Sequence, residues 1–376
     1  MSERHRILHM IGALVAGGAE RSCKDLILAM KRRGLPVELV CLVPRRDEAG
    51  LRWERLIRDA GIPIHDGPVE RLRLRTGMWL AGILRARDVR IVHIHLSYCE
   101  IGYVLSRLFH RRRYAVLRKI HNTALAEGMH RVAERVSDIR TYYSCGEAAH
   151  ESHLGHMKGR QVLIPNGLDF DWPRNDEAHR EERLRGLGLD PSRTHYVHIG
   201  RHGGPSVREC QKAQDVLIAA WRRGRLGERG GRLHFLGEGS LLGEHKSLAA
   251  GDDSIVFHGV VHNAHEWLSA CDVFVLPSRW EGLPLSGVEA VGTGIACIFS
   301  DIAPNHELGS DAAAYAPVED VDALSACLVE RVGAHERASA ESVEALRERW
   351  GVDRAVRQFV ALYEELYPPG ADRPTA

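Results

Sequence analysis

The 376-residue sequence lacks the features that mark several specialised classes of protein. No run of apolar residues approaches the ~20 that are needed to cross a lipid bilayer, so we expect a chain that is not integral to a membrane. The eight cysteines are scattered and include no C-x-x-C pair, which argues against zinc and against a disulfide framework. Free thiols in a reducing cytoplasm fit this pattern. His9 interrupts the N-terminal apolar run and a helix-like segment follows it, so the run does not predict a signal peptide.

Two glycine patterns that are typical of nucleotide cofactors are also missing. Gly17 and Gly18 follow the first apolar run, but they form neither G-x-G-x-x-G nor a Walker A loop. An oxidoreductase is therefore the weakest enzyme class for this chain. A helix is expected to begin at these glycines, and the free N–H groups at a helix start favour an anion. The alternative is a tight turn between a strand and a helix, without a ligand.

The net charge of +1 conceals an uneven distribution of charged residues. Residues 1–164 contain 29 Lys and Arg against 17 Asp and Glu, whereas the remainder contains 22 against 33. A basic first half could face anionic lipid, a phosphorylated acceptor or nucleic acid, or it could consist of solvated helix faces. Segments 71–87 and 103–114 mix Arg with Trp, Leu and Phe, which is typical of interfacial helices and also of helices packed on a sheet.

Short apolar runs alternate with amphipathic segments, which predicts an α/β fold built from parallel βαβ units. The runs are too apolar for a half-exposed antiparallel sheet, and the first helical segment is expected to end at Gly34. A polar stretch rich in Pro and Gly then interrupts the rhythm, which restarts after it and so predicts two α/β domains. We place a first domain at 1–168, a second at 169–350, a helix at 351–368 that packs back on the first domain, and a flexible tail at 369–376.

The stretch EGLPLSGVEA places two carboxylates around a strand-to-helix turn. Glu281 follows the apolar run CDVFVLPS, and Pro284 suits the first turn of a helix because it has no N–H to lose there. The N–H groups behind Pro284 are predicted to be free for a phosphate. Glu289 is about one turn further and could accept hydrogen bonds from the hydroxyl pair of a ribose. The helix dipole favours a carboxylate there by about 0.3–1 kcal/mol, which explains Glu289 alone but not Glu281 and the glycines.

Two cations follow another apolar run, HYVHIG. Arg201 comes directly after this strand and Lys212 precedes the next helix, with a Gly- and Pro-containing loop between them. Such a pair suits a diphosphate, because Arg offers a planar fork and Lys a point charge. By themselves these residues are more often surface charges. Gly237 marks a further turn after the strand RLHFL.

Several of the 22 histidines lie near predicted strand ends. His93 and His95 share one face of a strand, which allows a metal site, although no third ligand has an obvious spacing. His121 follows the strand AVLRKI and is the histidine that we predict to have a functional role.

In this order, the motifs resemble those of retaining nucleotide-sugar glycosyltransferases of family 4, which have the GT-B fold. Glu281 and Glu289 match the E-x7-E motif of that family. GGAER, LRKIHNT, VLIPNGLD, LHFLGEGS and SIVFHGVV resemble its other motifs, and the resemblance covers nearly the whole chain. It implies two Rossmann-like domains that face each other across a cleft, and closure of the two domains would assemble the site.

The resemblance also implies roles for individual residues. His121 and Glu281 would contact the transferred sugar, while Arg201 and Lys212 would neutralise the diphosphate. Glu289 would hold the ribose. The segment from Phe257 to Val261 would frame the nucleobase. The remaining predicted donor contacts are Gly17, Gly18, Gly237, Gly282, Leu283, Pro284 and Leu285. No metal and no other cofactor would be required, because the cations and the helix N-terminus stabilise the leaving group.

The chain departs from the family pattern at three points. The spacing between Arg201 and Lys212 is longer than usual, which makes Lys212 the less secure of the two assignments. VGTGIAC replaces a segment that commonly contains alanine and proline. Pro304 stands where glycines are frequent, beside Asn305 and Glu307, and could alter their contact with sugar or phosphate.

We therefore predict a hexosyltransferase that uses a nucleotide-diphosphate sugar, most plausibly a UDP-sugar. The acceptor would be a lipid-linked saccharide of a bacterial surface polymer, or else an aminocyclitol or another metabolite. Two alternatives stay open: a GT-B sugar-nucleotide epimerase, against which the E-x7-E spacing argues, and a non-catalytic partner in a glycan assembly complex. We expect a cytoplasmic location, with peripheral membrane contact through the basic first domain and no nucleic-acid partner.

Overall fold

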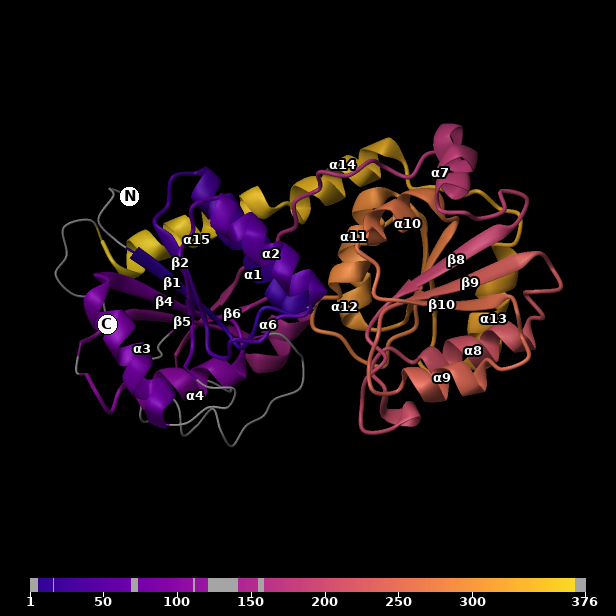
Figure 1. Cartoon of the computed structure of the whole chain (residues 1–376). Coiled ribbons are helices and arrows are strands. Elements are labelled where there is room, and N and C mark those ends of the chain that lie inside the picture. Colours follow the sequence, from indigo (N-terminus) through magenta and orange to yellow (C-terminus); the bar gives the residue numbers. More distant parts are fainter. Residues whose placement is uncertain are drawn as a thin grey trace. The chain divides into compact units, whose positions relative to one another are not determined.

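The computed structural model describes the chain apart from residues 1–5, 16, 69–73, 111, 121–140, 155–158 and 369–376. The chain forms two compact units, which are coloured along the sequence in Figure 1. The first unit combines Met1–Asp169 with Trp350–Ala376, and the second is Phe170–Arg349. Within the described residues, no helix is long and apolar enough to cross a lipid bilayer.

The first unit is built on a seven-stranded parallel sheet with the strand order β3-β2-β1-β4-β5-β6-β7. The strands are β1 (Arg6–Ile11), β2 (Val37–Cys41), β3 (Ile64–Asp66), β4 (Val89–Ile94), β5 (Ala115–Ile120), β6 (Thr141–Ser144) and β7 (Arg160–Leu163). The helices are α1 (Gly18–Arg32), α2 (Glu48–Asp59), α3 (Leu74–Ala86), α4 (Ser97–Ser106), α6 (Glu147–His153) and α15 (Val352–Leu366). Gly34 follows α1 with a φ of +77°, a left-handed conformation that suits the helix stop predicted there.

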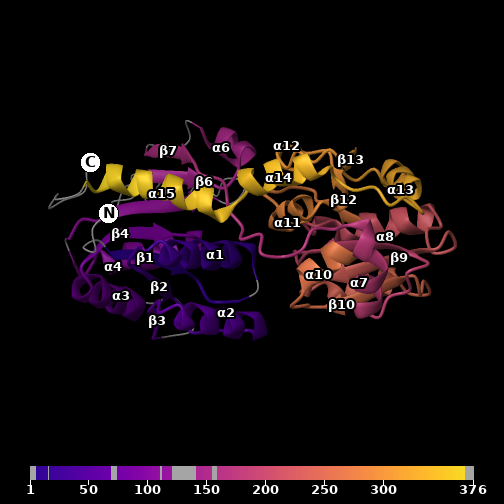
Figure 2. The ribbon, with the colours of Figure 1, turned by 90° about the horizontal axis from the view of Figure 1, so that it is seen from above.

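The C-terminal helix α15 packs on the same face of this sheet as α1, as Figure 2 shows. Its Phe359 and Tyr363 contact His93 of β4 with their rings. The chain returns to this unit beside Gly167, because Val352 N donates to Leu168 O at 2.9 Å. A Cβ atom on Gly167 would lie 2.4 Å from Val352 Cα, so only glycine allows this approach.

The arginine-rich segment 71–87 is a packed helix over most of its length. Gly77 of α3 faces α4 so closely that an added Cβ would lie 2.7 Å from the Leu105 carbonyl carbon. Leu74 and Met78 on the same helix are exposed, by 56% and 52%. One face of α3 is therefore committed to the first unit, and the other presents apolar side chains to the surface.

The second unit contains a six-stranded parallel sheet with the order β10-β9-β8-β11-β12-β13. The strands are β8 (Thr194–Ile199), β9 (Gly231–Leu236), β10 (Ile255–Gly259), β11 (Val273–Leu276), β12 (Ala296–Ser300) and β13 (Ala313–Ala316). The helices are α7 (Arg180–Gly186), α8 (Gln214–Arg223), α9 (Leu242–Leu248), α10 (Ala264–Ala270), α11 (Leu285–Thr293), α12 (Ala303–His306), α13 (Val321–Glu330) and α14 (Ala340–Arg349), with short 3-10 turns at Glu177–His179 and Val207–Glu209. Helices α8 and α13 cover one face of this sheet (Figure 1).

A fully buried carboxylate, Asp272, connects several elements of the second unit. It accepts hydrogen bonds from Nε and Nη2 of Arg180, at 2.6 and 2.9 Å, and from the backbone N–H of His195 at 2.8 Å. Burial by itself would raise the pKa of Asp272, but the hydrogen bonds from Arg180 and His195 hold that pKa below its usual value. The cluster is therefore charged and tightly paired inside the unit.

Neutral histidines are a second buried polar feature of this unit. His195, His234 and His258 lie side by side on β8, β9 and β10, and their rings are linked by contacts of 2.9 and 3.0 Å. Burial lowers the pKa of His234 to about 2, and it lowers the pKa values of His198 and His202 to about 3 and about 4. These three imidazoles therefore remain neutral in the folded unit well below the pH at which an unfolded chain would protonate them.

This difference predicts that the second unit loses stability as the pH falls. Above pH ~6.5 both states carry neutral imidazoles, so the histidines contribute no pH dependence. Below that pH the three histidines bind protons in the unfolded state but not in the folded state. Each histidine therefore lowers the free energy of unfolding by about 1.4 kcal/mol for each unit by which the pH falls. Three such groups imply a slope of about 4 kcal/mol per pH unit near pH 5.

Urea denaturation at pH 7, 6 and 5 measures this slope. The variant His234→Phe removes one of the three groups, so its unfolding free energy should fall less steeply with pH than that of the native chain. A denaturation midpoint that stays constant between pH 7 and pH 5 would contradict the prediction.

Candidate functional site

The strand order of the second unit places a topological switch point between β8 and β11. In open parallel sheets, ligands bind at such a point, beyond the carboxyl ends of the strands. The loop after β8 carries Arg201 and Lys212, and the loop after β11 carries Glu281. Three of the predicted catalytic residues thus come from the two strands that flank the switch point.

Glu281 is the best-anchored residue of this site. It is 5% exposed, and its Oε1 accepts hydrogen bonds from Lys212 Nζ at 2.6 Å and from Ser278 Oγ at 2.7 Å. Gln211 Nε2 donates to its Oε2 at 3.1 Å. The structure therefore brings Lys212 and Glu281 together despite the unusually long loop before Lys212. The Glu281 carboxylate is therefore held by Gln211 and Lys212 from the loop after β8 and by Ser278 from its own loop after β11.

Arg201 differs from Lys212 in that its charged group is not paired with a carboxylate among the described residues. Its side chain is exposed, and its guanidinium pairs with no carboxylate among the described parts of the chain. Its carbonyl oxygen accepts a hydrogen bond from Gln214 Nε2 at 3.2 Å, which fixes the backbone of the loop to α8. An exposed Arg on an anchored backbone is suited to meet an anionic ligand.

Helix α11 begins directly behind Glu281. Pro284 lies directly before the first turn of the helix rather than in it as predicted, since its ψ of 103° is extended and the helix starts at Leu285. Leu283 is 7% exposed and Gly282 is also buried, so this turn is enclosed. The first N–H groups of a helix have no partner within the helix and favour an anion, so the predicted phosphate contact at the start of α11 stays a prediction.

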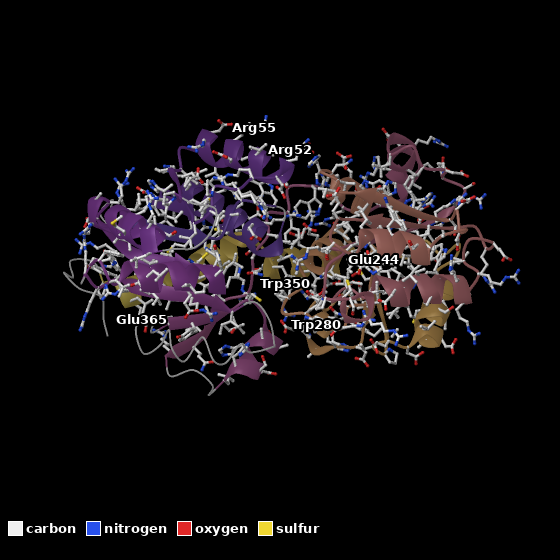
Figure 3. All side chains as sticks on the ribbon, turned by 60° about the horizontal axis from the view of Figure 1, so that its bottom comes forward. Arg52, Arg55, Glu244, Trp280, Trp350 and Glu365 are labelled. Carbon is white, nitrogen blue, oxygen red and sulfur yellow. The ribbon has the colours of Figure 1, made fainter. Side chains whose placement is uncertain are left out.

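Glu289 lies one turn into α11 and is 4% exposed. Pro284 and the following residues place it on the same short segment as Glu281, as the sequence predicts. No contact with a ligand tests the ribose role, which stays a prediction. The exposed Trp280, 40% accessible and labelled in Figure 3, stands immediately before Glu281.

Gly237 has a structural reason to be glycine. Its φ is +139°, and an added Cβ would lie 2.1 Å from the carbonyl oxygen of Gly200. Gly239 is similar, because a Cβ there would lie 2.0 Å from His202 O. These two glycines allow the loops after β8 and β9 to pack backbone against backbone. The predicted donor contact of Gly237 stays a prediction.

The predicted nucleobase segment, Phe257 to Val261, lies at the edge strand β10 and just after it. The Phe257 ring stacks on Phe235 with 4.8 Å between the ring centroids, so it packs against the apolar core of the unit. The strand ends at Gly259, whose φ is +70°, and Val260 is 41% exposed. Any base contact would thus come from the backbone and from the residues after Gly259 rather than from the Phe257 ring.

The predicted residues of the first unit are only partly described. His121 lies outside the described residues. Gly17 precedes α1 with a φ of −164°, which is extended backbone that any residue adopts, so its torsion angle does not require glycine. Gly18 is the first residue of α1. The helix start follows β1, beside the switch point between β1 and β4.

The pair His93 and His95 gains a third histidine in the structure, His9 of β1. The three imidazoles are fully buried and offer nitrogens within 4.8 Å of one another. Two of the three ring pairs are stacked, however, with 15° between the planes of His93 and His95 and 25° between those of His9 and His95. His9 Nδ1 lies 2.9 Å from His95 Nε2, and both nitrogens of His93 contact tyrosine hydroxyls. The nitrogen lone pairs of stacked rings do not converge, so the cluster has the geometry of a hydrogen-bonded core layer.

The side chain of Asn305 has a structural role. It is fully buried, and its Nδ2 donates to Ser300 O at 2.8 Å and to Ser300 Oγ at 3.0 Å. Pro304 lies in the first turn of α12, where proline is well tolerated. The amide of Asn305 therefore supports the end of β12.

The sequence interpretation missed Gln211, Ser278 and Arg279. Gln211 adjoins Lys212, and Ser278 and Arg279 directly precede the Glu281 segment. Adjacency to predicted site residues was the only available signal, because the contacts of Gln211 and Arg279 join positions about 70 residues apart. Ser278 contacts Glu281 only three residues further along the chain, but no motif marks it.

A parallel sheet with cations, a helix N-terminus and carboxylates around its switch point is the arrangement in which open α/β proteins bind anionic ligands. Two family models match the chain. Residues 16–172 match the model described as Glycosyltransferase Family 4, and residues 195–332 match Glycosyl transferases group 1. The chain is a glycosyltransferase, and its fold is of the GT-B type.

Similar proteins agree with this class. A Bacillus subtilis (strain 168) protein named as a glycosyltransferase, EpsF, is 26% identical over 336 residues, which are 80% of each chain. The lipopolysaccharide core biosynthesis mannosyltransferase LpsB of Rhizobium meliloti (strain 1021) is 30% identical over 205 residues, 50% of this chain and 56% of LpsB. The crystal structure of Anabaena Alr3699/HepE in complex with UDP-glucose superposes with a TM-score of 0.77 at 14% identity, covering 96% of this chain and 100% of that one.

Proposed function

We propose that this chain is a retaining, metal-independent glycosyltransferase that moves a hexosyl or N-acetylhexosaminyl group from a UDP-sugar to an acceptor hydroxyl. The observation that carries the proposal is the contact of 2.6 Å between Lys212 Nζ and Glu281 Oε1 at the switch point of the second sheet. This contact joins the predicted phosphate ligand and the predicted sugar ligand in one place. Arg201, whose guanidinium pairs with no carboxylate among the described residues, lies in the same loop after β8 as Lys212.

The leaving group of this reaction is a nucleoside diphosphate, on which negative charge develops as the glycosidic bond breaks. Arg201 and the N-terminus of α11 offer hydrogen-bond donors to that charge. Lys212 can bridge Glu281 and the diphosphate, since its ammonium has three donors and Glu281 uses one of them. Fixed donors of this kind lower the barrier without reorganising during the reaction.

Glu281 and Glu289 would hold the hydroxyl groups of the donor. Glu281 is fixed by three donors, so the orientation of its carboxylate toward the sugar would be defined before the donor binds. Glu289 would accept from the ribose hydroxyls. Retention would follow if the departing phosphate takes the proton of the acceptor on the same face of the sugar.

The acceptor that we favour is a lipid-linked saccharide of a bacterial surface polymer. LpsB is named as a mannosyltransferase of lipopolysaccharide core biosynthesis, which supports this choice. We infer a cytoplasmic enzyme that contacts the membrane peripherally through its basic first domain. The exposed Leu74 and Met78 of α3, beside Arg75, support such a contact.

Ligand binding to the intact chain tests the donor assignment. At 100 times its dissociation constant, a UDP-sugar should add about 2.7 kcal/mol to the unfolding free energy and raise the thermal midpoint, whereas ADP- and GDP-sugars should add less. A donor with a labelled sugar should then give a labelled product only when an acceptor is present. A converted sugar nucleotide without an acceptor would indicate an epimerase. Absence of both binding and nucleotide release would contradict the proposal.

A further inference from the structure

Arg279 joins three loops at the carboxyl edge of the second sheet. Its Nη1 and Nη2 donate to the two carboxylate oxygens of Asp215 at 3.1 and 2.8 Å, and Nη1 also donates to Cys210 O at 2.8 Å. Its Nε donates to Glu319 Oε1 at 2.7 Å. The side chains of Arg279 and Asp215 are 9% and 17% exposed, so their contact is largely shielded from water, whereas Glu319 is 58% exposed. The residue therefore connects the segments after β8, β11 and β13.

The backbone beside Arg279 is tied to the same segment. Arg279 N donates to Gln211 O at 2.8 Å, and Gln211 Nε2 donates to Trp280 O at 2.9 Å. Cys210 and Asp215, which Arg279 holds, lie on either side of Gln211 and Lys212 along the chain. Arg279 thus clamps both ends of the short segment that presents Lys212 and Gln211 to Glu281.

We propose that Arg279 is a positioning residue for transfer, which sets the distance between Lys212 and Glu281 through its contacts with Asp215 and Cys210. This inference rests on the proposed function. The long segment between Arg201 and Lys212 contains two glycines, a proline and little regular structure, so it does not fix Lys212 by itself. The planar, bidentate fork of Arg279 supplies the missing geometric constraint.

A double-mutant cycle separates positioning from a merely structural role. Arg279→Ala should lower kcat/KM by about 10- to 100-fold, because displacement of a catalytic group by 1 Å can cost about 100-fold. In a Lys212→Ala background the same change should cost less than about twofold, because the group that Arg279 positions is already absent. Arg279→Lys keeps the charge but loses the fork and should fall between Arg279→Ala and the native chain.

Arg223→Ala is the matched control. Arg223 belongs to the same unit and pairs with Asp322, but the two side chains are 66% and 73% exposed. We expect its loss to leave kcat/KM unchanged. If Arg279→Ala does not fold, Asp215→Asn, which removes the charge of the partner, replaces it in the cycle. Equal losses from Arg279→Ala with and without Lys212 would overturn the proposal.

Hydrogen exchange gives a readout that does not depend on turnover. Arg279→Ala should accelerate exchange of the amides in 204–212, while exchange in α13 stays unchanged. Unaltered exchange in 204–212 would also overturn the positioning role. If the native chain neither binds nor cleaves a UDP-sugar, the proposed function is wrong. The hydrogen-exchange result would still decide whether Arg279 fixes residues 204–212.

Discussion

Replacement of Arg201 by alanine is expected to lower kcat/KM for the UDP-sugar by roughly 10²- to 10³-fold. Loss of one preorganised donor to a developing negative charge costs about 3–4 kcal/mol of transition-state stabilisation. The Arg201 side chain is exposed and pairs with no carboxylate in the described part of the chain, so its removal should leave the fold intact. Steady-state kinetics and thermal unfolding of the same preparation measure both effects.

Arg208 provides the matched control for this experiment. It lies in the same loop between β8 and α8 and is likewise exposed. Arg208→Ala should leave kcat/KM within about twofold of the native value, because surface charges outside a contact contribute little. Equal losses from the two variants would show that the overall charge of the loop matters, and not the position of Arg201 after β8.

Replacement of Asp272 by asparagine is expected to destabilise the second unit by about 3–5 kcal/mol. Removal of one partner of a buried ion pair leaves the other charge uncompensated. Arg180 would lose its charged partner and one of two acceptor oxygens, because asparagine keeps a single carbonyl oxygen, and the Arg180 side chain is only 5% exposed. For a unit of this size, such a loss corresponds to a fall of about 10 °C in Tm.

Glu181→Ala is the corresponding surface control. Glu181 pairs with Arg185 at 2.7 Å, but both side chains are more than 60% exposed. Its loss should cost less than about 1 kcal/mol. Similar Tm values for the Asp272→Asn variant and the native chain would show that the buried cluster does not stabilise the unit.

The sheets were predictable where their strands are strongly apolar. β1, β4 and β8, of six residues each, and the four-residue β11 are such strands, and the amphipathic helices between them required parallel pairing. β3 and β13 were missed. β3 contains only Ile64–Asp66 and β13 contains mainly alanine, so neither carries a local signal, and both form because a neighbouring strand offers hydrogen bonds.

The site was predictable as a set of residues but not as a set of contacts. Arg201, Lys212 and Glu281 each follow a recognisable strand and precede a helix start. The pairing of Lys212 with Glu281, and the network of Ser278, Gln211 and Arg279 around them, joins two loops. Neither hydrophobic periodicity nor the spacing of motifs along the sequence predicts which loops will lie side by side, because that depends on the strand order of the sheet.

Local sequence was sufficient to predict two parallel α/β units, turns at glycine and proline, and candidate residues at strand ends, because hydrophobic period and local backbone preference act over a few residues. The strand order, the packing of α15 on α1 and the approach of Lys212 to Glu281 became known only from the folded chain. These features arise from burial and hydrogen bonding between segments that are distant in the chain, so their energies have no local signature.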